Sequence, residues 1–296
     1  MWQVPTQQAT PTLVQATLAW FTKAARDLPW RRNTCTPWGV LVSEVMLQQT
    51  QVDRVVPVWQ AWLERWPTPA DLADADLASI LRAWGRLGYP RRAQRLHAAA
   101  RMLVDQYDGQ VPDDDAALRA LPGVGEYTAA AVRAFAFGQP SVVLDTNVRR
   151  VITRAYSGVA LPAAHLTNTE RTLAATLVQS AGRHGARWSA AVMELGALVC
   201  TTRGPLCHDC PIRAQCSWFQ TGSPANAAPR RKQPRFTGSD RHVRGLILAR
   251  LREGSVPTAS MDLVWPNDDQ RQRALLALQA EGLVTNTRGR YRLPDR

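Results

Sequence analysis

The sequence predicts an all-α protein over residues 1–220, followed by a small module that combines helices with a short hairpin. Apolar residues recur at helical spacing in one segment after another, and glycine or proline residues separate these segments. No alternating strand pattern occurs before residue 220. With 296 residues, of which 45% are hydrophobic, the chain can form two or three domains with cores of their own.

The predicted helices begin near the N-terminus. Apolar residues follow helical spacing over 13–26, and Thr12 is a candidate N-cap for this segment. Residues 43–50 also lie on a predicted helix. Similar periodicity predicts five further helices, over 52–66, 76–87, 91–107, 126–137 and 147–156.

The C-terminal part has a different composition. Residues 220–240 are rich in proline, alanine and serine and contain a basic run, which predicts a linker. Beyond it, 241–252 and 268–280 have helical spacing, and 283–293 predict two short strands around a turn. Helices followed by a basic hairpin indicate a winged-helix-like module over 241–296. Such a module contacts either DNA or protein, and the sequence leaves both open.

The charge of the chain favours a polyanionic partner, since the formal net charge is +12 and the pI is about 10.5. Only Lys23 and Lys232 are lysines, so few side-chain amines exist to form a Schiff base. No apolar run approaches 18 residues, which predicts that nothing spans a membrane. The N-terminus shows no signal-peptide pattern, and we therefore expect a cytoplasmic protein.

Four cysteines lie within 17 residues, with the spacing C-x6-C-x2-C-x5-C: Cys200, Cys207, Cys210 and Cys216. Thiolates suit zinc or an iron–sulfur cluster. The single C-x2-C, flanked at unequal distances, favours a [4Fe–4S] cluster over a structural zinc site, and zinc or a disulfide set are the alternatives. The fifth cysteine, Cys35, has no assigned role.

A glycine hairpin and two carboxylates are further candidates for function. The backbone N–H groups of Gly123, Val124 and Gly125, in L-P-G-V-G before a helix, can hold a phosphate. Asp145 follows an apolar run, where it either acts in chemistry or caps the next helix. Glu44 lies among apolar residues on a helix, where burial would raise its pKa; a surface or capping role is the alternative.

Six motifs occur in the order found in one family: D-L-P-W-R at 27–31, S-E-V-M-L-Q-Q-T at 43–50, G-R-L-G-Y at 85–89, L-P-G-V-G at 121–125, D-T-N at 145–147, and the cysteine loop. Over residues 12–219 the chain resembles the adenine-specific mismatch DNA glycosylases (MutY type) of the helix-hairpin-helix/endonuclease III superfamily. S-E-V-M-L-Q-Q-T is the discriminating motif.

The resemblance implies a two-lobed helix-hairpin-helix DNA glycosylase fold with a [4Fe–4S] loop. One lobe is a six-helix barrel over 27–140, and the other joins 1–26 to 141–219. The implied substrate is double-stranded DNA that contains adenine opposite 8-oxoguanine or guanine, with the target nucleotide flipped out. We expect a monomer associated with the nucleoid, and no membrane partner.

The same resemblance assigns catalytic roles. Glu44 is expected to protonate the adenine and assist the attacking water, and Asp145, within Asp145-x-Asn147, to stabilise the positive charge on the sugar. Bifunctional relatives place a lysine just after the hairpin, where this chain has Tyr127. We therefore expect a monofunctional glycosylase.

The resemblance also assigns residues that contact the DNA. Arg26, Trp30 and Arg31 match positions that line the base pocket. Other residues match the wedge that fills the vacated stack and touches the opposite base: Gln48, Gln49, Thr50, Leu87 and Tyr89.

The chain departs from the family pattern in three places. Ala190 stands where several relatives carry glutamine or glutamate toward the adenine, and Pro90 follows Tyr89 where an aromatic pair is common. Only about 56 residues follow the predicted linker, so we expect a shortened form without the nudix-like C-terminal domain of larger relatives. Two alternatives stay open: a thymine or uracil glycosylase acting on G mispairs, and a non-catalytic DNA-binding protein with a cluster.

Overall fold

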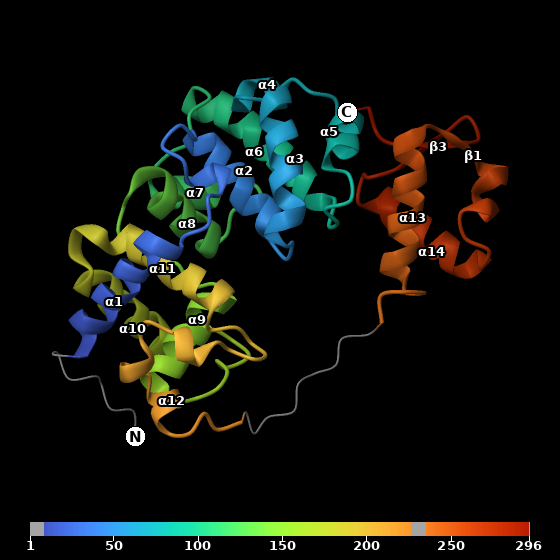
Figure 1. The fold of residues 1–296 in the computed structure, drawn as a ribbon. Coiled ribbons are helices and arrows are strands. Elements are labelled where there is room, and N and C mark those ends of the chain that lie inside the picture. Colours follow the sequence, from blue (N-terminus) through green and yellow to red (C-terminus); the bar gives the residue numbers. More distant parts are fainter. Residues whose placement is uncertain (1–8, 226–234, 296) are drawn as a thin grey trace. The chain divides into compact units, whose positions relative to one another are not determined.

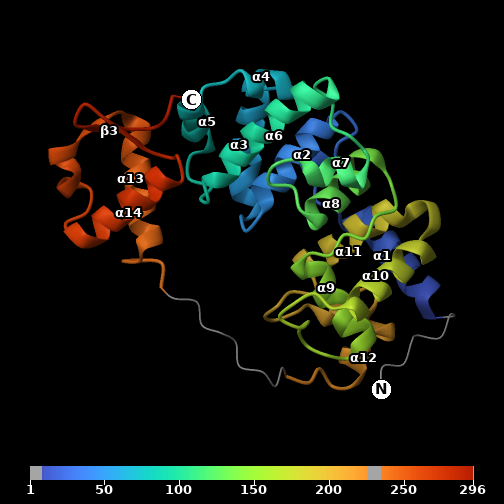
Figure 2. The ribbon, with the colours of Figure 1, turned by 180° about the vertical axis from the view of Figure 1, so that it is seen from behind.

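The computed structural model describes residues 9–225 and 235–295, and it is mostly helical (Figures 1 and 2). Two compact units divide the chain. Unit 1 comprises Met1–Val40, Asp113–Arg119 and Val124–Arg230, within the described residues. Unit 2 comprises Leu41–Pro112, Ala120–Gly123 and Arg231–Arg296, with the same restriction.

Unit 1 is organised around its central helix α11 (Gly185–Leu198), whose Trp188 and Leu195 are buried. Alanines of α8 pack against one side of α11. The other helices of the unit are α1 (Ala9–Ala24), α7 (Asp115–Ala120), α8 (Glu126–Phe137), α9 (Thr146–Ile152), α10 (Asn168–Ser180) and α12 (Ser217–Gln220). Helices α9 and α11 pack against each other, and they approach closely at Gly196 of α11, which lies against Asn147 of α9.

Unit 2 contains five helices before residue 112: α2 (Pro37–Leu47, which begins in unit 1), α3 (Val52–Arg65), α4 (Pro69–Ala73), α5 (Leu77–Trp84) and α6 (Arg91–Tyr107). Three tryptophans form part of their core. The Trp62 ring meets those of Trp66 and Trp84 edge to face, at centroid distances of 4.6 and 5.6 Å. Trp62 and Trp84 are almost fully buried, so they anchor α3 against α5.

The C-terminal part of unit 2 consists of α13 (Asp240–Glu253), β1 (Val256–Pro257), α14 (Asp268–Ala280), β2 (Thr285–Thr287) and β3 (Arg290–Arg292). The strands form one antiparallel sheet in the order β1-β3-β2. Two side chains bind this part to the earlier helices. Arg252 Nε donates to the Leu81 carbonyl at 3.1 Å, and Gln94 Nε2 donates to the carbonyls of Glu281 and Gly282.

Most of the predicted elements are confirmed. The helices predicted over 91–107 and 126–137 coincide with α6 and α8. The two predicted C-terminal helices and the hairpin are also present. The N-cap prediction at Thr12 is wrong, because α1 begins at Ala9. Pro11 lies in the first turn of α1, where its missing N–H has no intrahelical acceptor in any case, so the helix tolerates it.

The prediction missed several elements. Helix α10 was missed although it begins with a capping box between Thr167 and Glu170, and α11 was missed because it is buried on several sides and lacks a polar stripe. Of the predicted linker, 226–234 lies outside the described residues. The predicted lobe boundaries stay a prediction. Among the described helices, none combines the length and the apolar character needed to cross a bilayer.

Candidate active site and cysteine pocket

Glu44 lies in α2 within unit 2 and is only 4% exposed. Its neighbours Ser43 and Met46 are fully buried, so the carboxylate belongs to the interior side of the helix. The alternative of a surface carboxylate is therefore excluded. A buried carboxyl group on a helix is well placed for proton transfer.

Asp145 is the N-cap of α9 in unit 1. Its Oδ1 accepts a hydrogen bond from the Val148 N–H at 2.6 Å, and its Oδ2 accepts one from Asn147 Nδ2 at 2.8 Å. Burial raises the pKa of Asp145, and the two hydrogen bonds oppose that rise because they stabilise the ionised form. Asp145 therefore does cap the helix, and its position at the cap is also what orients its carboxylate.

A buried arginine connects Asn147 to the loop that follows α11. Arg150 Nη2 donates to Asn147 Oδ1 and to the Gly196 carbonyl, both at 2.7 Å, and its Nε donates to the Cys200 carbonyl at 2.7 Å. A Cβ atom at Gly196 would lie 2.7 Å from the Cβ of Asn147, so only glycine permits this approach. Asp145 is thus connected to the first cysteine through two side chains.

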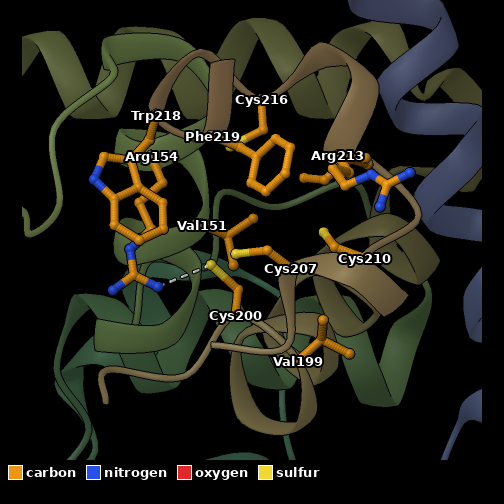
Figure 3. A pocket seen from close by; sticks show the side chains of 11 residues that line it. Val151, Arg154, Val199, Cys200, Cys207, Cys210, Arg213, Cys216, Trp218 and Phe219 are labelled. Atoms are coloured by element: carbon orange, nitrogen blue, oxygen red, sulfur yellow. Dashed lines mark hydrogen bonds between the residues drawn. The ribbon is translucent and has the colours of Figure 1, made fainter. Parts of the chain in front are cut away.

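The four clustered cysteines line one pocket (Figure 3). Arg154, on the π-helical turn Thr153–Ser157 that continues α9, donates to Cys200 Sγ at 3.4 Å and to the Thr201 carbonyl at 2.8 Å. Its guanidinium lies over the Trp218 ring, 4.5 Å from the centroid. The remaining lining is mostly apolar: Val151, Val199, Ile212 and Phe219, with Arg213.

The donor set fits a thiolate-bound cluster. Burial raises the pKa of Cys210 to about 12, with the neighbouring thiols adding to the effect, and burial also raises the pKa of Cys207 and Cys216. Four thiolates would need nearby positive charge, which a bound metal centre would supply together with the adjacent guanidiniums of Arg154 and Arg213. Among the described residues no three ligands are arranged around a single metal ion.

Arg26 and Arg31, the predicted base-pocket arginines, converge on Glu194 of α11. Arg26 Nε and Nη2 bind the two carboxylate oxygens at 2.8 Å, and Arg31 Nη2 binds Oε2 at 2.9 Å. Burial would raise the pKa of Glu194, but these hydrogen bonds outweigh it and lower the pKa to about 2. Trp30, between the two arginines, is buried. Glu194 therefore fixes the geometry of the predicted pocket.

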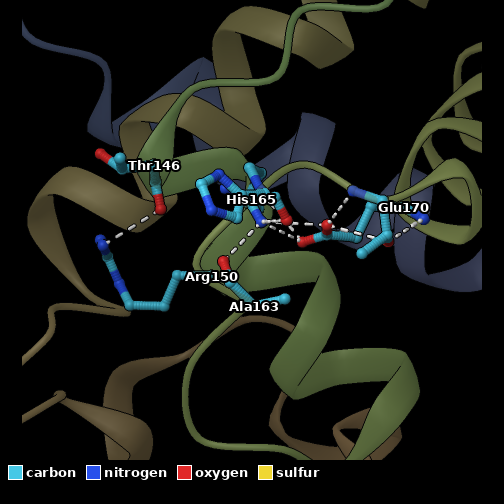
Figure 4. A network of polar contacts seen from close by, with 7 residues as sticks. Thr146, Arg150, Ala163, His165 and Glu170 are labelled. Atoms are coloured by element: carbon cyan, nitrogen blue, oxygen red, sulfur yellow. Dashed lines mark hydrogen bonds and ion pairs between the residues drawn. The ribbon is translucent and has the colours of Figure 1, made fainter.

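A second ion pair, between Arg149 and Glu170, holds the segment that precedes α10 (Figure 4). Arg149 Nη2 also donates to the carbonyls of Ala163 and His165. Glu170 in turn accepts from the Thr167 N–H and hydroxyl. Arg149 and Arg150 thus extend from one helix in two directions, the first to this segment and the second to the cysteine loop.

The glycine hairpin has the conformation expected of a tight turn. Gly123 has φ +86°, and a Cβ atom there would lie 2.9 Å from the Cβ of Arg95. Gly125 is the N-cap residue of α8, and Val124 is buried. Tyr127 lies half-buried in the first turn of α8, packed against the α8 alanines. The N–H groups at the start of α8 can therefore receive a phosphate.

The predicted wedge residues divide into two groups. Gln49 and Tyr89 are exposed, Tyr89 by 48%, and both are non-glycine residues with positive φ, +58° and +48°. Thr50 and Leu87 are buried. Gln48 is half-buried. Their assignment to the wedge stays a prediction, but only the first two side chains are presented at the surface of this structure.

Four charged residues were missed by the sequence analysis: Arg150, Arg154 and Glu194 of these sites, and Arg92, which binds the backbone beside the predicted wedge residues. All four are buried. One available signal was position, since Arg92 lies on the face of α6 that also carries Ala93, Leu96 and Ala100. A charged residue on an apolar face either extends to solvent or has buried partners, and sequence alone does not distinguish the two.

Comparison with known proteins identifies relatives over nearly the whole chain. Residues 42–175 match the family described as HhH-GPD superfamily base excision DNA repair protein. A Mycolicibacterium smegmatis protein named adenine DNA glycosylase is 49% identical over 280 residues, 93% of this chain and 94% of the relative. The human adenine DNA glycosylase is 41% identical over 207 residues, which is 67% of this chain and 38% of the human protein.

Two solved structures share the fold. A thermostable thymine-DNA glycosylase has a TM-score of 0.65 and 29% identity, with 72% of this chain and 98% of that chain covered. Endonuclease III in a non-covalent complex with DNA has a TM-score of 0.63 and 25% identity, with 74% and 99% covered. Both similarities leave about a quarter of this chain unmatched.

Proposed function

The chain belongs to the adenine DNA glycosylases of the HhH-GPD superfamily, and on this premise we propose that it removes adenine mispaired with 8-oxoguanine or guanine in double-stranded DNA. The observation that carries the proposal is the 49% identity to an adenine DNA glycosylase over 93% of the chain. Because 93% of the chain is aligned, the similarity extends into the segment after residue 219.

The proposed reaction is hydrolysis of the bond between adenine and C1′ of the deoxyribose. Glu44 protonates the flipped-out adenine, which leaves with the electron pair of the broken bond. Asp145, ionised, stabilises the positive charge that develops on the sugar. Water then adds to C1′ while Glu44 accepts its proton. Burial of Glu44 and the cap geometry of Asp145 support these roles.

The enzyme is proposed to be monofunctional. A lyase step requires an amine that attacks C1′, and the position after the hairpin is occupied by Tyr127. Lys23 lies exposed at the end of α1, and Lys232 lies outside the described residues. We assign Tyr127 and Asn147 to the active site, Asn147 as the residue that orients Asp145.

Arg26, Trp30 and Arg31 are proposed to line the adenine pocket. Glu194 holds both guanidiniums in place, so they reach a purine without reordering. Ala190 lies on the same helix, four residues before Glu194, and contributes no polar group. Adenine selectivity is therefore expected to rest on the arginine pair and on Glu44.

A [4Fe–4S] cluster is proposed to occupy the pocket lined by Cys200, Cys207, Cys210 and Cys216. The four thiols, Arg154 and the apolar lining support this assignment. When bound, the cluster supplies structural cross-linking of the loop. Through Arg150, that loop also fixes Asn147, so the cluster supports the orientation of Asp145 without taking part in the chemistry.

The DNA-binding surface is proposed to include the hairpin N–H groups of Gly123, Val124 and Gly125, and the exposed Gln49 and Tyr89. Residues 241–296 are proposed to form a winged-helix-like module. Its β2–β3 hairpin carries three exposed arginines and no acidic residue, which supports a contact with the phosphate backbone. A monomeric state and a cytoplasmic, nucleoid-associated location stay predictions.

The hairpin contact is tested with Arg288→Gln, because Arg288 lies at the exposed tip. Loss of one phosphate contact lowers the slope of log affinity against log salt by about one. Arg250→Gln, an exposed arginine on α13, is the matched control. An unchanged slope with Arg288→Gln would assign the module to a protein partner instead.

The function as a whole is tested by single-turnover base release on a panel of duplexes: adenine opposite 8-oxoguanine, guanine and thymine, and thymine or uracil opposite guanine. Strand breaks are measured in each reaction with and without alkali treatment. We expect adenine release opposite 8-oxoguanine, with strand breaks only after alkali. Release of thymine or uracil would favour the second candidate, which the fold similarity to a thymine-DNA glycosylase keeps open. Binding without any release would indicate a non-catalytic protein.

A further inference from the structure

Arg92 is a buried cation whose hydrogen-bond acceptors are almost all backbone carbonyls. It is 7% exposed and lies in the first turn of α6. Its Nη1 donates to the carbonyls of Val45, Met46 and Gln48, at 2.9, 2.9 and 2.6 Å. Among the described residues, no carboxylate forms an ion pair with it.

The second nitrogen of the guanidinium binds a different turn. Arg92 Nη2 donates to the carbonyls of Leu87 and Gly88, at 3.4 and 3.1 Å, and to Thr50 Oγ1 at 3.0 Å. One side chain therefore joins the turn after α2 to the turn after α5, two segments about 40 residues apart in the sequence. Thr50 strengthens the link, since its hydroxyl also lies 3.4 Å from the Leu87 carbonyl.

The first set of carbonyls belongs to the end of the catalytic helix. Val45 and Met46 are in the last turn of α2, where carbonyls have no partner within the helix and the helix dipole is negative. A guanidinium is favourable at that position. Burial lowers the pKa of Arg92 to about 10, which leaves it protonated at neutral pH. Arg92 thus caps the helix that carries Glu44.

The residues at the centre of the two turns have unfavourable backbone conformations. Gln49 and Tyr89 have positive φ without being glycine or asparagine, a conformation that persists only where the surroundings hold it. Arg92 binds the residues on both sides of Gln49 and the two residues before Tyr89. The Tyr89 ring also lies 5.5 Å from the guanidinium carbon. Both strained residues are exposed, although the group that holds them is buried.

We propose that Arg92 is a positioning residue that holds Gln49 and Tyr89 in the mutual arrangement needed to contact the base opposite the adenine. The proposal rests on the proposed function. It also explains how two turns that are distant in sequence can contact the same base. A role as a helix cap alone would require contacts only to the carbonyls at the end of α2. The contacts of Arg92 are instead concentrated on the two turns and on the catalytic helix.

The test compares Arg92→Met, Arg92→Lys and the control Arg101→Met, an exposed arginine on the same helix. Single-turnover adenine release is measured opposite 8-oxoguanine and opposite guanine. We expect Arg92→Met to lower the rate opposite 8-oxoguanine by about 10- to 100-fold, because small displacements of positioning groups have effects of this size. The ratio of the two rates falls toward one. Arg92→Lys gives an intermediate ratio, and Arg101→Met gives the wild-type ratio.

Hydrogen exchange of the amides in 48–50 and 87–89 provides a second readout. Arg92→Met accelerates exchange in both turns together, while the remaining helices of unit 2 keep their protection. If Arg92→Met does not fold, Thr50→Val removes one acceptor and is expected to give the same change of rate ratio on a smaller scale. A rate that falls equally on both duplexes, with the ratio unchanged, would overturn the proposal.

Failure of the proposed function is distinguishable from failure of this inference. If the wild-type enzyme releases no adenine, the function is wrong. The inference is then judged by the affinity of wild type and Arg92→Met for duplexes with 8-oxoguanine or guanine opposite adenine. If both proteins prefer 8-oxoguanine over guanine to the same extent, the inference is overturned. If the variant loses this preference, the inference is supported.

Discussion

Each unit contributes one carboxylate to the proposed reaction, and the two are held in different ways. Asp145 in unit 1 begins a helix, accepts two hydrogen bonds, and is connected through Asn147 and Arg150 to the cysteine loop. Glu44 in unit 2 lies within a helix whose C-terminal carbonyls are bound by Arg92. In both units a buried arginine binds backbone carbonyls. In unit 1, however, the arrangement also depends on the cysteine loop, which is proposed to hold a cluster.

This difference implies that the two proposed catalytic carboxylates should lose their orientation for different reasons. Substitutions in the cysteine pocket should disturb the orientation of Asp145 first, because only that carboxylate is connected to the loop. Substitution of Arg92 should first disturb the turns that contain Gln49 and Tyr89 and the helix that carries Glu44. The four changes below test this separation, from the largest expected effect to the smallest.

Glu44→Gln removes the proposed acid of unit 2 and should lower base release by at least about 10³-fold, within the range for loss of an acid–base group. DNA affinity should stay close to that of the wild type, since no phosphate contact is lost. Single-turnover release and equilibrium binding on the same duplex measure the two effects. Glu64→Gln on α3, an exposed carboxylate, is the control. Full activity in Glu44→Gln would show that Glu44 does not transfer the proton in this reaction.

Cys200→Ser alters unit 1 by replacing one proposed cluster ligand whose carbonyl also binds Arg150. We expect loss of bound iron, a lower melting temperature and at least about a tenfold slower release, a loss typical of a changed metal-ligand shell. Iron content, thermal unfolding and single-turnover kinetics are measured together. Hydrogen exchange in 48–50 and 87–89 should not change. Cys35→Ser, outside the pocket, should match the wild type; equal damage from both variants would contradict the assignment.

Glu194→Gln tests a second feature of unit 1, the carboxylate that binds Arg26 and Arg31, independently of the cysteine pocket. The folded-state pKa of Glu194 lies below its usual value, so its stabilisation is present above about pH 4.5 and is lost as the pH falls toward about 2. At pH 7 we expect a loss of about 2–3 kcal/mol in the free energy of unfolding. Denaturant unfolding at pH 7 and pH 3 should show the difference from wild type shrinking at the lower pH.

The matched control for that change is Asp27→Asn, which removes an exposed ion pair with Arg32. Surface pairs are screened by water and salt, so its unfolding curve should coincide with that of the wild type at both pH values. A Glu194→Gln variant that behaves like this control would show that the arginine pair does not depend on Glu194.

Asn147→Ala has the smallest expected effect: it removes the hydrogen bond to Asp145 and one acceptor of Arg150. Asn147 donates to the ionised carboxylate, so its loss should raise the pKa of Asp145 further. The acid limb of base release should then move to higher pH by about one unit, the size expected for one hydrogen bond to a charged group. The pH profile of the single-turnover rate measures the shift. A uniformly lower rate with an unmoved acid limb would contradict the assignment.

The sequence allowed good predictions wherever the determining interactions are local. Helices α6 and α8 coincide with their predicted bounds, because spacing and glycine or proline positions set them. The cysteines that line the pocket were predicted as one group from spacing alone. Helix α11 was missed because the faces it buries are decided by several partner helices, which leave no simple period.

What the sequence by itself determined is the set of short-range features: the helical segments, the clustered thiols, the glycine hairpin and the order of the motifs. Only the tertiary structure decided which charged side chains are buried and what they bind. Arg92 and Arg150 have acceptors about 40 to 50 residues away, and Glu194 binds arginines more than 160 residues away. A buried charge is stable only when partners from other segments surround it, and no local pattern records that they do.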